Sequence, residues 1–445
     1  MDASKKDGCS LSARPRTPGG WDSSDRSIYP ARKKMKLPDY NADSSIKTTE
    51  GMLILYHLSI SLFTRKNEKM TGIVETMQAF KIRDIAIDPP LILSPMAGVT
   101  DYTFRRLIKR RGGVGLVVSE FISVEGLTRG NPKSKRQMRF DEEERPYAVQ
   151  IFGGQPERMA MGAEMAEEVG ADILDVNCGC PAPKVVKNGG GSGLLKEPAR
   201  LETILKEIKK AITIPLTLKL RTGFTDATIN VVEVAKMAEQ CGVEHIQVHG
   251  RTREQGYKGL ANWDVIGQVK QAVSVPVSGN GDITTLEYGM KRWAETGVDG
   301  ILIGRGAMQN PWIFRQFEDV LDGRKPYQPD LAEKKAVLLE FFEMCLGEMP
   351  ELVALGKMKQ LAGQFTKGLV GGAQFRQTLY HSHSATEILD NISRYFETII
   401  LDADGLTEIE SEESLDIEFQ SCENPFTIDT HKPEPVNTLT SRLAK

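Results

Sequence analysis

From position 91 onward, short apolar runs alternate with longer stretches in which apolar residues recur every three or four positions. The runs have the length of buried strands, and the stretches between them have the period of amphipathic helices. This alternation is typical of parallel strands joined by crossover helices. The predicted strands are 91–95, 115–119, 147–151, 172–177, 215–220, 245–249, 275–278 and 300–304. The clearest predicted helices are 157–169, 201–211, 229–241, 263–272 and 285–296.

Eight such units within about 230 residues predict an α/β fold of the (β/α)8 TIM barrel type. A doubly wound open sheet is the alternative, but its usual glycine-rich dinucleotide turn does not follow the first strand. After residue 314 the pattern becomes helical only, over 331–348, 352–366, 372–381 and 385–401. We therefore expect a barrel over residues 85–320 and a small all-α domain over 321–401.

Both ends of the chain lack this periodicity. Residues 1–84 are predicted to be a disordered leader, or to precede a later translation start at Met52, Met70 or Met77. Residues 402–445 form a predicted disordered tail with eleven acidic and three basic residues. The net charge of −3 therefore divides into −8 for this tail and +5 for the rest. Basic clusters at 105–111 and 133–136 are either solvated helix faces or phosphate contacts.

Composition excludes several other classes. No stretch approaches the roughly 20 apolar residues that cross a bilayer, so no membrane association is expected. The six cysteines are scattered, and their spacing matches neither a disulfide framework nor a metal site. These features indicate a cytoplasmic protein without a bound metal, and we expect a monomer.

Polar and glycine-rich segments follow the predicted strands, where a barrel enzyme places its chemistry. The first strand ends in a segment with small residues and a proline, 94–98, whose backbone can approach a flat ligand closely. The residues assigned to this contact are Pro95, Met96 and Ala97. The seventh and eighth strands are followed by glycine-rich turns whose N–H groups can bind a phosphate, with Arg305 as a charged partner. The residues assigned to this phosphate site are Asn280, Gly281, Asp282, Gly304 and Arg305.

Four further strand-end residues carry polar chemistry. Lys219 lies between two leucines, and a lysine buried there needs an anionic or electron-rich partner in the barrel mouth. His249 ends the next strand. A single histidine at a strand end is usually structural, and His249 is a candidate site residue only because Lys219, Gln150 and Asn177 also lie at strand ends. Gln150 can donate and accept, which suits the edge of a heteroaromatic ring.

Cys180 lies on a Gly- and Pro-bearing loop, 177–181, just after the fourth predicted strand. A cysteine there could be a nucleophile, a metal ligand or a proton donor. The partners of a cysteine hydrolase do not occur nearby and the metal spacing is wrong, so proton donor remains. Cys178 is interpreted as a packing residue.

These segments, in their order, resemble the tRNA-dihydrouridine synthases, in the general style of the bacterial B-type subgroup. The resemblance spans about residues 85–400 and rests on SPMAGVTD at 94–101, QI at 150–151, NCGCP at 177–181, GSGLL at 191–195, KLRTG at 219–223, HGRT at 249–252, NGD at 280–282 and GRG at 304–306.

The resemblance implies an FMN-dependent reductase that converts selected tRNA uridines to 5,6-dihydrouridine, with NADPH or NADH as reductant. It implies Cys180 as the acid that protonates C5. It places Gln150, Lys219 and His249 near the flavin ring, the 280–282 and 304–305 turns around its phosphate, and Asn177 and Arg221 at the uracil. Arg105 is expected to contact the tRNA, and the helical domain to form a second wall.

One segment departs from the family pattern. Where the family commonly has an Arg-Lys-His-type cluster, residues 357–365 are KMKQLAGQF. Two alternatives also stay open: a flavin barrel that reduces a free pyrimidine or small enone, and a non-catalytic tRNA-binding protein. The helical domain disfavours the first alternative, and the presence of Cys180, Lys219 and His249 disfavours the second.

Overall fold

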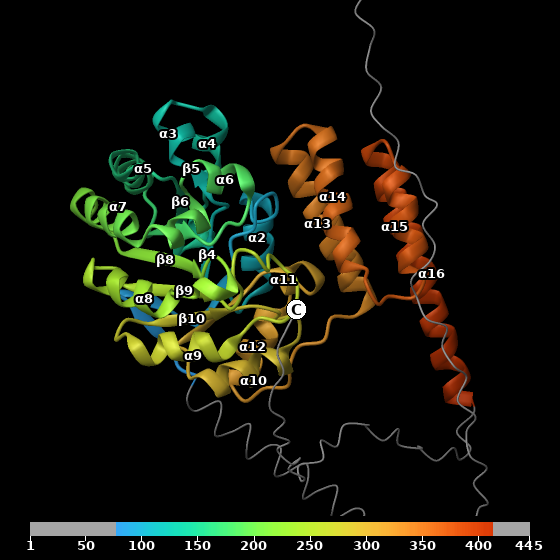
Figure 1. The fold of residues 1–445 in the computed structure, drawn as a ribbon. Helices are drawn as coiled ribbons and strands as arrows, with labels where there is room; N and C mark the ends of the chain where they lie inside the picture. The colour runs from blue at the N-terminus through green and yellow to red at the C-terminus, as the bar shows by residue number, and fades with distance from the viewer. Residues whose placement is uncertain (1–76, 413–445) are drawn as a thin grey trace, which may run out of the picture. The chain divides into compact units, whose positions relative to one another are not determined.

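The computed structural model describes residues 77–412, and within them eight parallel strands close into a barrel surrounded by helices (Figure 1). Closure comes from the pairing of the last strand with the first and of the second with the third. Around the barrel the strands are β3 (Leu91–Leu93), β4 (Leu116–Val118), β6 (Tyr147–Phe152), β7 (Ile173–Cys178), β8 (Leu216–Arg221), β9 (His245–His249), β10 (Val277–Asn280) and β11 (Gly300–Ile303). The predicted TIM barrel is confirmed. A two-residue strand, β5 (Ile122–Ser123), also pairs with β6.

The outer helices bury one face against the strands. In α7 (Pro198–Ala211), the buried residues Leu201, Ile204, Leu205 and Ile208 recur with the helical period. The other long helices around the barrel are α2 (Tyr102–Arg111), α5 (Pro156–Glu168), α8 (Val231–Gln240), α9 (Trp263–Ala272), α10 (Leu286–Thr296) and α12 (Ile313–Leu321). Short helices and 3-10 turns complete it: α3 (Val124–Thr128), α4 (Pro132–Gln137), η1 (Glu142–Glu144), α6 (Pro183–Lys187), η2 (Gly191–Lys196), η3 (Asp226–Thr228) and α11 (Arg305–Gln309).

An antiparallel hairpin, β1 (Phe80–Ile82) and β2 (Ile85–Ile87), precedes the barrel. The ring of Phe80 lies 5.2 Å from the ring of His245, the first residue of β9. The hairpin therefore packs at the amino-terminal end of the strands, opposite the end that carries the chemistry. Residues 1–84 were predicted to be a disordered leader, and for β1 this prediction is wrong. Phe80 and Ile82, which alternate along the strand, are buried in the core. The predicted disorder of residues 1–76 and 413–445 lies outside the described residues.

Up to residue 412, four helices follow the barrel: α13 (Leu331–Glu348), α14 (Glu351–Phe365), α15 (Gly372–His381) and α16 (Ala385–Glu412). Phe341 of α13 packs edge to face on Phe104 of α2, with ring centroids 6.3 Å apart. Helix α16 continues eleven residues beyond the predicted helix end at residue 401. The glutamates that suggested a disordered tail are good helix formers, which explains the difference. Among the described residues, no helix is both long and apolar enough to span a membrane.

Candidate active site

A cavity of about 700 Å³ opens at the carboxyl ends of the barrel strands. Its walls come from the last residues of β8 and from the loops after β3, β4, β7, β9, β10 and β11, with Gln360 and Gln364 of α14 on one side. This volume suits a cofactor or a nucleotide-sized ligand. Thirteen of the fifteen predicted site residues line it: Pro95, Met96, Ala97, Asn177, Cys180, Lys219, Arg221, His249, Asn280, Gly281, Asp282, Gly304 and Arg305.

The two glycine-rich turns are closely packed, and Gly281 leaves no room for a larger residue. A Cβ atom on Gly281, whose φ is +142°, would lie 2.4 Å from the Cβ of Ala261. A Cβ on Gly304 would lie 3.3 Å from the sulfur of Met96. Both turns therefore bring bare backbone to the cavity, as the sequence pattern predicts for a phosphate-binding wall.

The Asp282 carboxylate is fully engaged inside the protein. Its two oxygens accept from Nη2 of Arg251 at 2.7 and 2.8 Å, and Oδ2 also accepts from the backbone N–H of Ala261 at 2.8 Å. Arg305 Nη2 approaches Oδ1 at 3.4 Å. The Asp282 side chain is thus placed to hold the loop after β9 and to orient Arg305, rather than to contact an anion itself.

Lys219 of β8 and His249 of the adjacent β9 both line the cavity, and each is 8% exposed. Burial, together with the charge of Arg221, lowers the pKa of Lys219 to about 8, and Asp175 opposes this shift. Its Nζ donates to Oδ1 of Asn280 at 3.4 Å. Burial and the neighbouring Lys219 and arginines hold the pKa of His249 well below its usual value, so this imidazole is neutral.

Cys180 lies in the cavity wall on the loop after β7, and it is 8% exposed. Asn177 Oδ1 accepts from the backbone N–H groups of Gly179 and Cys180 at 3.2 and 2.9 Å. Ser192 of η2 donates its hydroxyl to the Cys180 carbonyl at 2.9 Å. Burial raises the pKa of the Cys180 thiol, so the thiol carries its proton at neutral pH. A buried, protonated thiol on a fixed backbone can act as a proton donor.

Comparisons with known proteins match this geometry. The family model for dihydrouridine synthase (Dus) matches residues 92–400. The tRNA-dihydrouridine synthase B of Pseudomonas putida is 42% identical over 301 residues, which cover 67% of this chain and 89% of that protein. A probable tRNA-dihydrouridine synthase of Rickettsia conorii is 37% identical over 74% of this chain and 99% of that protein. The tRNA-dihydrouridine synthase B of Pseudomonas aeruginosa is 40% identical over 67% and 90%, respectively.

The chain belongs to the dihydrouridine synthase family. It is bacterial B-type-like, and it is therefore an oxidoreductase. The family resemblance inferred from the strand-end motifs is confirmed.

Gln150 is the first predicted site residue that this synthase places elsewhere. Its side chain is fully buried and is not part of the cavity wall. Its Nε2 donates to Asp175 Oδ2 at 2.5 Å, and its Oε1 accepts from Asn177 Nδ2 at 2.8 Å. The expectation that Gln150 contacts a flavin edge is therefore not supported, because its side chain is buried inside the barrel and does not reach the cavity wall.

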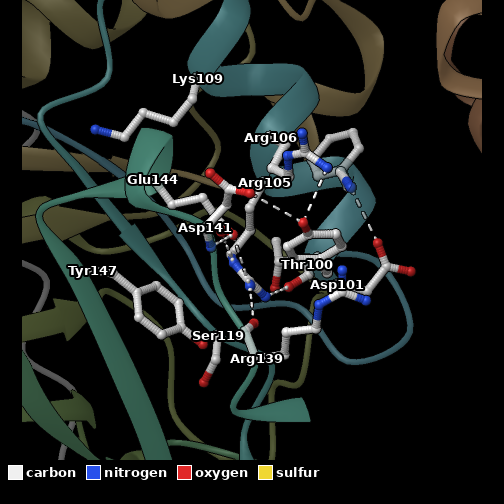
Figure 2. Close-up of polar contacts among 12 residues, drawn as sticks. Thr100, Asp101, Arg105, Arg106, Lys109, Ser119, Arg139, Asp141, Glu144 and Tyr147 are labelled. Atoms are coloured by element: carbon white, nitrogen blue, oxygen red, sulfur yellow. Dashed lines mark hydrogen bonds and ion pairs between the residues drawn. The ribbon is translucent and has the colours of Figure 1, made fainter. Parts of the chain in front are cut away.

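Arg105 is the second, and here the prediction of a tRNA contact is wrong. Arg105 is 1% exposed, and its Nε donates to Glu144 Oε2 at 2.6 Å. Figure 2 shows its guanidinium enclosed by Glu144 and the backbone carbonyls of Thr100 and Arg139. Thr100 belongs to the loop after β3, and other residues of this loop line the cavity. Arg105 therefore stabilises the loop through the Thr100 carbonyl.

The rest of that basic cluster is also paired. Arg106 and Arg110 form ion pairs with Glu143, and Arg111 pairs with Glu340 of α13. Burial lowers the pKa of Lys109 to about 8, and its Nζ donates to two backbone carbonyls. This cluster is therefore neither a solvated helix face nor a phosphate-binding patch. Its ion pairs join α2 to η1 and α13. The second basic cluster, on α4, is exposed.

Sequence reasoning missed Tyr257, Gln360 and Gln364 as cavity residues. Tyr257 is 62% exposed, and Arg305 lies 5.0 Å from its ring centre. A tyrosine in a polar, glycine-flanked loop eight residues after β9 was the available signal. For the two glutamines the signal was their spacing of one helical turn on α14, but nothing local shows that this face meets a barrel.

Proposed function

We propose that this protein reduces the C5–C6 double bond of selected uridines in tRNA, with FMN as its flavin and NADPH or NADH as the reductant. The observation that carries the proposal is the position of Cys180, whose backbone is held by Asn177 and Ser192 in the wall of a cavity that also contains Lys219 and the two glycine turns. Family membership supports the same reaction.

The cavity suits FMN in charge as well as in volume. The bare backbone of Gly281 and Gly304 would face the phosphate, and Arg305 would add a charge-assisted contact. Lys219 would contribute positive charge beside the ring system. FMN, when bound, supplies the hydride that adds to C6 of the uracil.

The protein must complete the reduction at C5. Hydride addition at C6 breaks the C5–C6 π bond and leaves an electron pair at C5, which takes up a proton. Cys180 is the acid in this proposal because its pKa is raised, so the thiol holds a proton at neutral pH. Asn177 and Arg221 would hold the uracil in the same wall, with Arg221 fixed by donation to the Gly179 carbonyl at 2.7 Å.

A uridine within a folded tRNA must leave its stack to reach this cavity. Gln360 and Gln364 of α14 give the cavity a wall beyond the barrel, which favours a substrate larger than a free pyrimidine. The exposed basic residues of α4 are candidates for contact with the tRNA backbone.

The test uses the full chain reconstituted with FMN, tRNA from cells that lack the gene, and NADPH. Formation of a nucleoside heavier than uridine by two hydrogens is the expected result. Reduction of free uracil or uridine at the same rate as tRNA would favour the small-substrate reductase instead. Flavin binding without any product would favour a tRNA-binding role.

A further inference from the structure

A buried polar network lies below the candidate site, inside the barrel. Asp175, Gln150 and Gln247 are each fully buried, on the inner faces of β7, β6 and β9. Asp175 Oδ2 accepts from Gln150, and Oδ1 accepts from Thr217 at 2.6 Å and from Gln247 at 3.1 Å. Three donors thus meet one carboxylate, which explains how a charge is accommodated there.

This network has only one consistent direction. Burial raises the pKa of Asp175 to about 6. Above that pH its ionised carboxylate accepts and never donates, so Gln150 must turn its Nε2 toward Asp175. Its Oε1 then faces Asn177 and requires the Nδ2 of that residue, at 2.8 Å. The Asn177 Oδ1 is left facing the N–H groups of Gly179 and Cys180, which need an acceptor. We call this chain of hydrogen bonds, from Asp175 through Gln150 and Asn177 to the Cys180 loop, the relay. The carboxylate at one end and the backbone N–H groups at the other require the same orientation of the two amides.

We propose that Asp175 is a positioning residue that fixes the amide orientations of Gln150 and Asn177 and so holds the backbone of the Cys180 loop. The strand register supports this relay, because Gln150 pairs with Asp175 and Asp175 with Thr217 across adjacent strands. Asp175 is not among the cavity-lining residues, and it reaches the Cys180 loop through the two amides. The catalytic consequence rests on the proposed role of Cys180, whereas the effect on the loop does not.

The first experiment is hydrogen exchange, followed by mass spectrometry of a peptide that contains Gly179 and Cys180. Asp175→Ala removes the acceptor, so the Asn177 amide is free to reverse and the two N–H groups lose their partner. We expect their exchange to accelerate about tenfold, the equivalent of one net hydrogen bond. Asp175→Asn should recover most of the protection. An asparagine oxygen can still face Gln150, while the Gln247 Oε1, unpartnered among the described residues, can turn to accept from the new amide.

Two further variants make the test specific. Gln150→Leu breaks the relay at its next link and leaves the carboxylate in place, so it should accelerate exchange as Asp175→Ala does. Thr217→Val removes a donor to the same carboxylate on the side away from Gln150, and it should leave the loop protected. It controls for damage to the buried network as such.

The second readout is the single-turnover rate of tRNA reduction by flavin-loaded enzyme, expected to fall about tenfold in the two relay variants. The inference is overturned if Asp175→Ala and Gln150→Leu both exchange like Thr217→Val. If Asp175→Ala does not fold, Gln150→Leu alone decides in the same way. Accelerated exchange in an enzyme that forms no dihydrouridine even as wild type would support the relay and reject the proposed function.

Discussion

Replacing Cys180 by alanine removes one sulfur atom from the cavity wall and leaves its supports in place. Asn177 holds this loop through the backbone N–H groups of Gly179 and Cys180, and Ser192 through the Cys180 carbonyl. None of these contacts uses the thiol. Cys180→Ala should therefore fold, bind FMN, accept electrons from NADPH and bind tRNA like the wild type.

The chemical step should suffer much more than the fold. General acids contribute about 10²- to 10⁴-fold to a rate, which corresponds to roughly 3–5 kcal/mol of activation free energy. Because residue 180 is only 8% exposed, water has little access to replace the thiol. We expect the loss to lie in the upper half of that range.

The assay is a single turnover of pre-reduced enzyme with unmodified tRNA, followed by flavin absorbance and by dihydrouridine content. The matched control is Cys178→Ala. Cys178 is fully buried on β7, so its replacement should cost some stability but little rate. A Cys180→Ala rate equal to that of the wild type, or a loss shared equally by Cys178→Ala, would refute the assignment of the acid.

Three other outcomes are expected. Lys219 is cationic below its pKa of about 8, so FMN affinity measured by fluorescence should weaken between pH 7 and pH 9. Lys219→Met should bind FMN more weakly than the wild type. An equal pH effect in Lys219→Met would show that the effect does not come from Lys219. Arg105→Ala strands a buried Glu144 and should cost about 3–5 kcal/mol in urea unfolding. This cost should be smaller at pH 5 than at pH 8, because a protonated Glu144 carries no charge to bury; a cost independent of pH would contradict the buried pair. Neutralising the three basic residues of α4 should reduce the salt dependence of tRNA binding by about one log–log unit per contact, and an unchanged slope would exclude that helix from the interface.

The barrel and most of the site could be predicted from sequence because both depend on local patterns. Eight apolar runs of strand length specify the strands, and polar residues placed just after them converge once the barrel closes. Lys219, His249 and Cys180 were predicted in this way, and all three line the cavity. Residues just after neighbouring parallel strands come close together whenever those strands pair in register, so their proximity does not depend on contacts between distant segments.

Two predicted site residues lie away from the cavity, because each pairs with a segment distant in sequence. Arg105 looked like a surface charge because Glu144, its partner, lies 39 residues away. Gln150 looked like a ligand contact because Asp175 belongs to the next strand. Charge alone does not reveal whether an arginine meets solvent or a buried carboxylate, and no local period marks which face of α14 meets the cavity.

The central claim is that this chain reduces uridine within tRNA at the cavity containing Cys180. The most direct measurement is nucleoside mass spectrometry of tRNA, taken from cells lacking the gene and incubated with the FMN-loaded protein and NADPH. We predict dihydrouridine at discrete positions with the wild type and nearly none with Cys180→Ala. Oxidation of NADPH by the wild type with no gain of dihydrouridine in any tRNA would contradict the claim.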